Sequence, residues 1–145
     1  MDAHISDVSR VIQLAVAPVF LLTSIATMIN AMNTRLGRIV DRRRVVRERI
    51  KQSTSEAQTL EFHAELNTLV YRSRLAYLGI LYSVLAALLV CLVIGGAFIG
   101  ALISVDLAKT VAIIFVLAMS SMVISLGMFL REVYLGVSSG VDASR

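Results

Sequence analysis

The sequence predicts an all-α integral membrane protein with three transmembrane helices and a cytoplasmic antiparallel helical hairpin between spans one and two. Its composition is the first reason, because the 145 residues are 57% apolar and 17% charged, against about 45–50% and about 25% in soluble domains. The second reason is that charge is missing from three long runs. The third is that ten of the fourteen Lys and Arg residues lie between positions 35 and 74.

The uncharged runs cover residues 11–34, 75–105 and 110–130, and each reaches the ~20 residues that a membrane-spanning helix needs. We expect one membrane domain, 1–145, with spans at about 9–34, 75–103 and 108–131. The hairpin occupies 35–74, an outer turn lies at about 104–108, and an inner C-terminal tail covers 132–145. The first run exceeds the roughly 7–15 apolar residues of a signal peptide, so we expect it to be retained as a span.

The distribution of positive charge predicts the orientation. Lys and Arg in short loops stay on the cytoplasmic side, and the opposite side carries only Arg10 and Lys109. We therefore expect the N-terminus outside and the C-terminus inside. The second run would extend roughly 46 Å as a helix, against about 30 Å of hydrocarbon, so it should tilt, project or bend, with Gly95-Gly96 as the expected bend.

The 35–74 segment divides into two arms of opposite charge. Residues 35–51 carry a net charge of +6 and residues 52–71 a net charge of −3, and both arms have apolar residues at helical spacing. Ser53 and Glu56 have the spacing of a capping box, which predicts a turn near Ser53. Antiparallel pairing would then place Lys51 near Glu56, Arg47 near Glu61, and the triplet Arg42, Arg43 and Arg44 near Glu65.

The same arginine triplet is a candidate contact for partners outside the chain. Anionic lipid headgroups lie beside such residues at the inner leaflet, and an acidic cytoplasmic protein is the other partner we consider. A positive-inside loop needs these charges for topology, so we do not expect nucleic-acid binding.

Polar residues follow one face of the first span. At 100° per residue, Thr23, Thr27, Asn30 and Thr34 fall within about 60° of one another. In one interpretation this face hydrogen-bonds to a neighbouring helix. In the other, copies of it surround a pore whose candidate lining residues are Val16, Phe20, Thr23, Thr27, Asn30, Thr34 and Arg38.

Small residues recur every fourth position along the second span. Such residues let membrane helices approach closely, so we predict helix packing through Gly79, Ser83, Ala87, Cys91, Gly95, Gly96 and Gly100. Ser121 and Ser125 on the third span are the expected counterparts. Pro18 should bend the first span or free a carbonyl group for a neighbour.

Residues for catalysis are scarce. No charged residue lies deep in a span, where it would indicate a proton relay or ion-coupled transport. His4 and His63 fall on opposite sides of the predicted membrane, and Cys91 is the only cysteine. We expect no enzyme activity, no metal and no cofactor.

The chain also resembles a known family. The segments Ile12-Gln13-Leu14-Ala15-Val16-Ala17-Pro18 and Asn30-Ala31-Met32-Asn33-Thr34-Arg35-Leu36-Gly37-Arg38 carry the resemblance most specifically. The family is a widespread bacterial group of short membrane proteins that is known only as a domain of unknown function. The resemblance implies a multi-pass protein of the bacterial inner (cytoplasmic) membrane and no particular activity.

Two functions remain open from the sequence. The first is a homo-oligomeric channel or pore, with its pathway between protomers and the first helix as its lining. The second is a non-conducting scaffold or regulatory protein whose basic hairpin binds a partner protein or anionic lipid.

Overall fold

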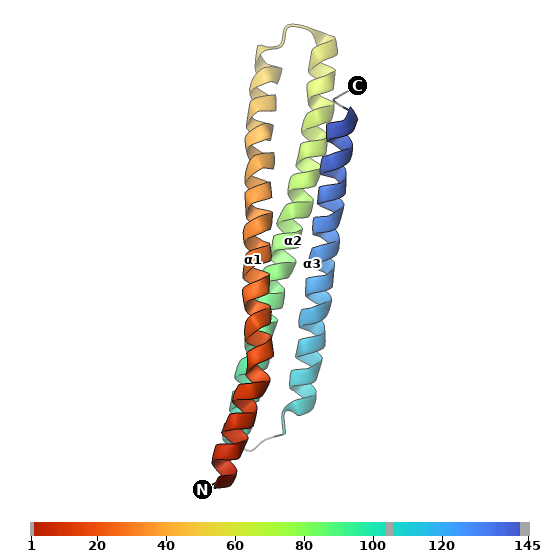
Figure 1. The fold of residues 1–145 in the computed structure, drawn as a ribbon. Helices are drawn as coiled ribbons and strands as arrows, with labels where there is room; N and C mark the ends of the chain where they lie inside the picture. Colours follow the sequence, from red (N-terminus) through yellow and green to blue (C-terminus); the bar gives the residue numbers. More distant parts are fainter. Residues whose placement is uncertain (1, 104–105, 143–145) are drawn as a thin grey trace. The chain divides into compact units, whose positions relative to one another are not determined.

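The computed structural model describes residues 2–103 and 106–142, which form three α-helices. Helix α1 spans Asp2–Gln52, α2 spans Glu56–Ile103 and α3 spans Ala108–Asp142 (Figure 1). Each contains a segment long and apolar enough to cross a membrane. The prediction of an all-helical, multi-pass protein is thereby confirmed.

The helices extend well beyond the apolar runs. Helix α1 continues without interruption from the first span through the basic arm and contains Pro18. Helix α2 is likewise continuous through Gly95-Gly96. The segment expected to be a C-terminal tail is part of α3, which continues to Asp142. Residues 104–105 of the expected outer turn lie outside the described residues.

Buried residues recur every seven positions along the helices. On α1 they are Ile25, Met32, Ile39 and Val46, each at most 4% exposed. On α3, Ala118, Ser125 and Glu132 follow the same interval. A seven-residue repeat keeps one seam of a helix turned toward its neighbours, as in coiled coils and helix bundles. The other residues of these buried seams are apolar or small, so a glutamate at position 132 is an exception.

The chain divides into two compact units, each with its own packing. The apolar unit comprises Met1–Ile29 and Tyr82–Ile124. Its core contains Ile25 from α1, Ala86 and Val90 from α2, and Ala118 from α3. The Ser121 hydroxyl of α3 donates a hydrogen bond to the carbonyl oxygen of Tyr82, at 3.3 Å. Small side chains at these positions allow α2 and α3 to lie close together.

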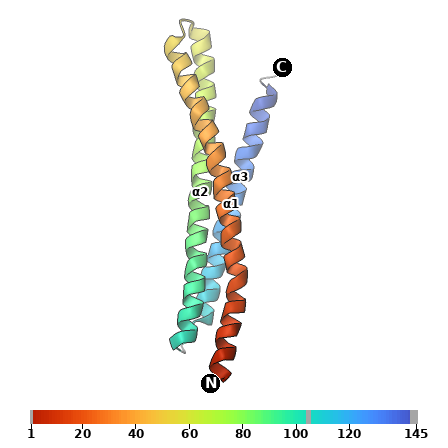
Figure 2. The ribbon, with the colours of Figure 1, turned by 60° about the vertical axis from the view of Figure 1, so that its left-hand side comes forward.

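The charged unit comprises Asn30–Leu81 and Ser125–Arg145. Here α1 and α2 form the predicted helical hairpin, whose arms lie side by side up to the turn at residues 53–55 (Figure 2). Ile39 and Val46 pack against Leu69 in its core. Gly79 of α2 faces α1, because a Cβ atom there would lie 3.2 Å from Cε of Met32.

The turn differs in detail from the sequence prediction. Helix α2 begins at Glu56, so Ser55 rather than Ser53 precedes it, and the Ser55 carbonyl accepts the first amide hydrogen bond, from Thr59, at 3.1 Å. The Ser53 hydroxyl instead donates to the Ser55 carbonyl oxygen. The turn is therefore closed by hydrogen bonds among Ser53, Ser55 and Thr59 and not by a Ser53–Glu56 capping box.

Candidate functional site

The predicted pore-lining residues lie on the exposed side of α1. Val16 is 48% exposed and Phe20 is 71% exposed. The polar members are exposed as well: Thr23, Thr27, Asn30, Thr34 and Arg38. At 100° per residue the centre of this face lies roughly 145° around the helix from the centre of the buried seam. We call these seven residues the α1 polar face. At its outer end Val16 and Phe20 line a groove with residues of α2, and at its other end Arg38 lines a pocket with Arg72.

Hydrogen bonding on the α1 polar face stays within α1. The hydroxyls of Thr23, Thr27 and Thr34 donate to the carbonyl oxygens four residues earlier, at 3.4, 3.0 and 2.9 Å. The side-chain amide of Asn30 has no hydrogen-bond partner among the described residues. Among the described residues, therefore, this face forms no hydrogen bond between α1 and another helix of the chain.

The small residues of α2 are distributed over several environments. Gly79 and Ser83 are buried, and the Gly79 carbonyl oxygen accepts a hydrogen bond from Ser125, at 2.7 Å. Ala87, Gly95, Gly96 and Gly100 are half-buried, and Cys91 is exposed. A four-residue interval advances 40° beyond a full turn, so the series winds around the helix and cannot keep to one interface.

The arginine triplet is partly engaged inside the hairpin. Arg42 forms an ion pair with Glu65 at 2.7 Å, and Arg43 donates to the Ser73 hydroxyl at 3.2 Å. Arg44 is exposed and has no partner among the described residues. Lys51 pairs with Glu48 within α1, at 3.5 Å. Of the three predicted pairings between the arms, only that to Glu65 is present in the described part of the chain.

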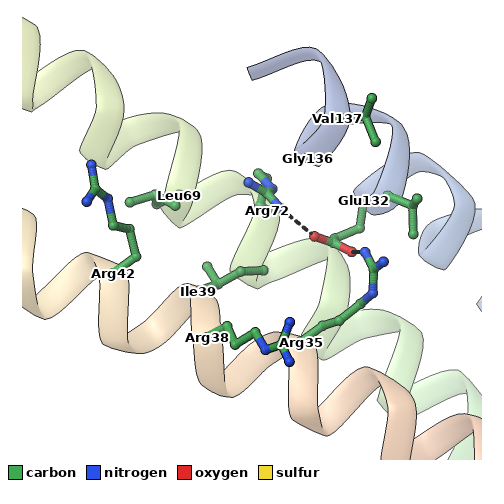
Figure 3. Close-up of a pocket in the computed structure, with 10 residues that line it drawn as sticks. Arg35, Arg38, Ile39, Arg42, Leu69, Arg72, Glu132, Gly136 and Val137 are labelled. Atoms are coloured by element: carbon green, nitrogen blue, oxygen red, sulfur yellow. Dashed lines mark hydrogen bonds and ion pairs between the residues drawn. The ribbon is translucent and has the colours of Figure 1, made fainter. Parts of the chain in front are cut away.

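A buried carboxylate joins all three helices in the charged unit. Glu132 of α3 is 1% exposed. One carboxylate oxygen lies 2.8 Å from Nη2 of Arg72 on α2, and the other lies 3.1 Å from Nη1 of Arg35 on α1 (Figure 3). The Arg35 guanidinium also lies over the ring of Phe129, 5.4 Å from its centroid. We call Arg35, Arg72 and Glu132 the Glu132 cluster.

This cluster fixes α3 against the hairpin. A buried carboxylate needs a partner for each oxygen, since an unpaired buried charge costs several kcal/mol, and arginine supplies directional donors for this purpose. Both oxygens of Glu132 are satisfied, each by a different helix. This geometry holds the three helices in one register. Both guanidinium groups are bound to the carboxylate, so neither is available as a general acid or base.

Gly136 makes room for Arg72. It lies one turn after Glu132, and a Cβ atom at this position would lie 2.6 Å from Nη2 of Arg72. That nitrogen is the one that donates to Glu132. A side chain at Gly136 would therefore displace the Arg72 guanidinium from its present position beside Glu132.

Replacing Gly136 with alanine should lower the free energy of unfolding by about 1 kcal/mol. The Arg72–Glu132 bond is weakened at a cost of about 1.5–3 kcal/mol, and about 1 kcal/mol is regained from helix propensity. Gly127→Ala on the same helix is the matched control, because a Cβ there meets nothing within 4 Å. Chemical denaturation in detergent should show Gly127→Ala slightly stabilised. Equal stabilisation of both variants would contradict the role of Gly136.

A pocket of about 400 Å³ adjoins the Glu132 cluster (Figure 3). Its charged lining consists of Arg35, Arg38, Arg42, Arg72 and Glu132, and its apolar lining includes Ile39 and Leu69. The described residues contain no group of three or more His, Cys, Asp or Glu side chains arranged to hold a metal ion.

Sequence reasoning missed Glu132, Arg72 and Gly136. Glu132 lies two residues beyond the third uncharged run and was included in the expected tail. One signal was available: Ala118, Ser125 and Glu132 stand seven residues apart, and Glu132 is the first acidic residue after Asp106. Such a repeat places the glutamate on the same seam as the small packing residues.

Three helices able to span a membrane, two of them joined as a hairpin and all three tied by a buried ion cluster, define a multi-pass membrane protein. Residues 15–140 match a family described as a protein of unknown function (DUF2721), and the chain belongs to this family. The resemblance drawn from the sequence is thereby confirmed. No curated protein and no solved structure matches the chain.

Proposed function

We propose that this protein is a homo-oligomeric membrane channel whose pathway forms between protomers and is lined by the α1 polar face. The single observation that carries the proposal is the placement of Asn30. Its amide is exposed, it lies on the side of α1 opposite the buried seam, and it has no partner among the described residues.

An exposed asparagine within an apolar run favours a partner outside the chain, and Asn30 differs from Asn33 in sharing one face of α1 with the three threonines. In hydrocarbon an amide without hydrogen bonds is unfavourable, and membrane helices bury such groups against other helices or water-filled cavities. The three threonines on the same face satisfy their own hydroxyl protons within α1. The threonines can therefore face either hydrocarbon or a polar surface. The amide of Asn30, in contrast, needs a hydrogen-bond partner from another helix or from water.

The order of residues along this face favours a pore over a dry helix contact. Val16 and Phe20 would form an apolar constriction, followed by the threonines and Asn30, with Arg38 at the mouth. Rings of such residues control hydration and ion passage in channels. Three helices are too few to enclose a pathway, so several copies of the chain are needed.

The proposed setting is the inner membrane of a bacterium. The basic hairpin at 35–74 would lie in the cytoplasm under the positive-inside rule, with the N-terminus outside and the C-terminus inside. The exposed tyrosines of the charged unit, Tyr71, Tyr77 and Tyr134, suit the inner membrane–water interface, which tyrosine side chains prefer.

A non-conducting scaffold is the second candidate function. Arg44 favours it, because this residue is exposed and free to contact an acidic protein or anionic lipid. Arg42 and Arg43 weigh against it, because both are engaged with Glu65 and Ser73 inside the hairpin. We therefore place the channel first. In the scaffold, charge reversal at Arg44 would abolish partner cross-linking in native membranes and Asn30→Leu would have little effect.

Purified protein in a planar bilayer should conduct ions, and Asn30→Leu should lower the conductance about tenfold, the rate change for about 1.4 kcal/mol added to a barrier. Asn33→Leu is the matched control. It makes the same substitution on an exposed residue of the same helix, about 90° away from the centre of the polar face, and should conduct nearly as the unaltered protein does. A silent bilayer, or equal effects of the two variants, would contradict the channel.

A further inference from the structure

The pocket beside the Glu132 cluster carries more positive charge than the protein neutralises. Four guanidinium groups line it, from Arg35, Arg38, Arg42 and Arg72, and among the described lining residues Glu132 is the only carboxylate. Counting Glu65, which pairs with Arg42 from outside the lining, the local balance is still about two positive charges. A pocket of about 400 Å³ with this surplus is suited to an anion.

The four arginines also retain hydrogen-bond donors. Arg38 has no hydrogen bond or ion pair with a described residue. Arg72 contacts Glu132 through Nη2, which leaves Nη1 without a partner among the described residues. Arg42 contacts Glu65 through Nε and Nη2, which leaves Nη1. Guanidinium groups with spare donors bind the oxygens of phosphate groups especially well.

The apolar part of the lining indicates where such a group comes from. Ile39, Leu69, Val133 and Val137 form the remaining wall of the pocket. Arg35 directly follows the first uncharged run, and Glu132 lies two residues beyond the third, so the pocket lies at the end of the apolar segments. Basic pockets between helices at this depth are where phosphate headgroups of anionic lipids are held.

We propose that this pocket binds a phosphate group through Arg38, Arg42 and Arg72, with Arg35 and Glu132 setting their positions. The phosphate belongs either to a lipid headgroup or to a soluble ion, and both present the same oxygens to the guanidinium groups. Arg38 is the residue that connects this site to the α1 polar face, since it lines both. The proposal does not depend on conduction and applies equally to a non-conducting protein.

The test uses the full-length protein and two probes. In the lipid arm, native mass spectrometry compares binding of phosphatidylglycerol with that of zwitterionic phosphatidylcholine. In the soluble arm, inorganic phosphate is titrated calorimetrically into protein held in phosphatidylcholine nanodiscs. Binding in the first arm identifies a headgroup and binding in the second a soluble ion. Arg38→Gln should weaken the binding about tenfold, the value expected for one charge-assisted hydrogen bond.

Arg44→Gln is the matched control. It removes the same charge from the same helix, at an exposed residue outside the pocket lining, and should change the affinity by less than about twofold. Neither arginine has a partner among the described residues, so both variants should fold normally. Equal losses of affinity in the two variants would mean that binding reflects general surface charge, which would overturn the proposal. Absence of binding by both probes would overturn it as well.

Discussion

Replacing Glu132 with glutamine should lower the free energy of unfolding by about 3 kcal/mol, the lower end of the range for breaking a buried ion pair. Glutamine keeps the shape of the side chain but presents an NH₂ group where a carboxylate oxygen now accepts a hydrogen bond. It also leaves two arginine charges facing one neutral group. The lower end of the range applies because the Arg35 side chain is 43% exposed, so water compensates part of its charge.

Glu65→Gln is the control for this prediction. Glu65 also forms a close ion pair with an arginine of the hairpin, at 2.7 Å, but its side chain is 35% exposed. Exposed pairs contribute about 0–1 kcal/mol, so this variant should unfold nearly as the unaltered protein does. Chemical denaturation in detergent, followed by circular dichroism, measures both. A Glu132→Gln protein as stable as Glu65→Gln would mean that the cluster does not fasten α3.

Single cysteines on the α1 polar face should cross-link copies of the chain. Cys91 is the only native cysteine, so Cys91→Ala provides a background without thiols. In that background, Thr27→Cys treated with a short bifunctional thiol reagent in native membranes should convert most of the protein to covalent oligomers. The reason is that equivalent positions around a symmetry axis lie close to one another.

Val123→Cys in the same background is the control. Val123 is 64% exposed, belongs to α3 and lies in the same apolar unit as Thr27. Its thiol should react with the reagent but remain monomeric on a denaturing gel. Efficient cross-linking at position 123 with none at position 27 would place α3 at the contact between copies and exclude α1 as the lining.

The sequence was sufficient for the helices because their signal is local. Three uncharged runs specify three apolar helices, and the apolar spacing of 35–74 specifies a hairpin. The length of each helix was harder to predict from the sequence. Charged residues at 35–52 and 131–142 end the apolar runs without ending the helices, because neither segment contains proline.

The Glu132 cluster was beyond the sequence for a different reason. The burial of a carboxylate depends on which residues of other helices reach it, and Arg35 and Arg72 lie 97 and 60 positions away in the chain. Charge arithmetic over the hairpin arms identified the Arg42–Glu65 pair, which is local to the hairpin. The same reasoning did not consider a carboxylate on α3, although Glu132 of α3 is the most deeply buried partner of these arginines.

We infer that copies of the α1 polar face surround a hydrated pathway. Electron cryomicroscopy of the protein in lipid nanodiscs tests it most directly, because it reports the number of copies and the helix nearest the symmetry axis in one measurement. We predict a ring of protomers with α1 innermost and Asn30 facing water. A monomer, or an assembly whose axis is dry and lined by α3, would contradict the claim.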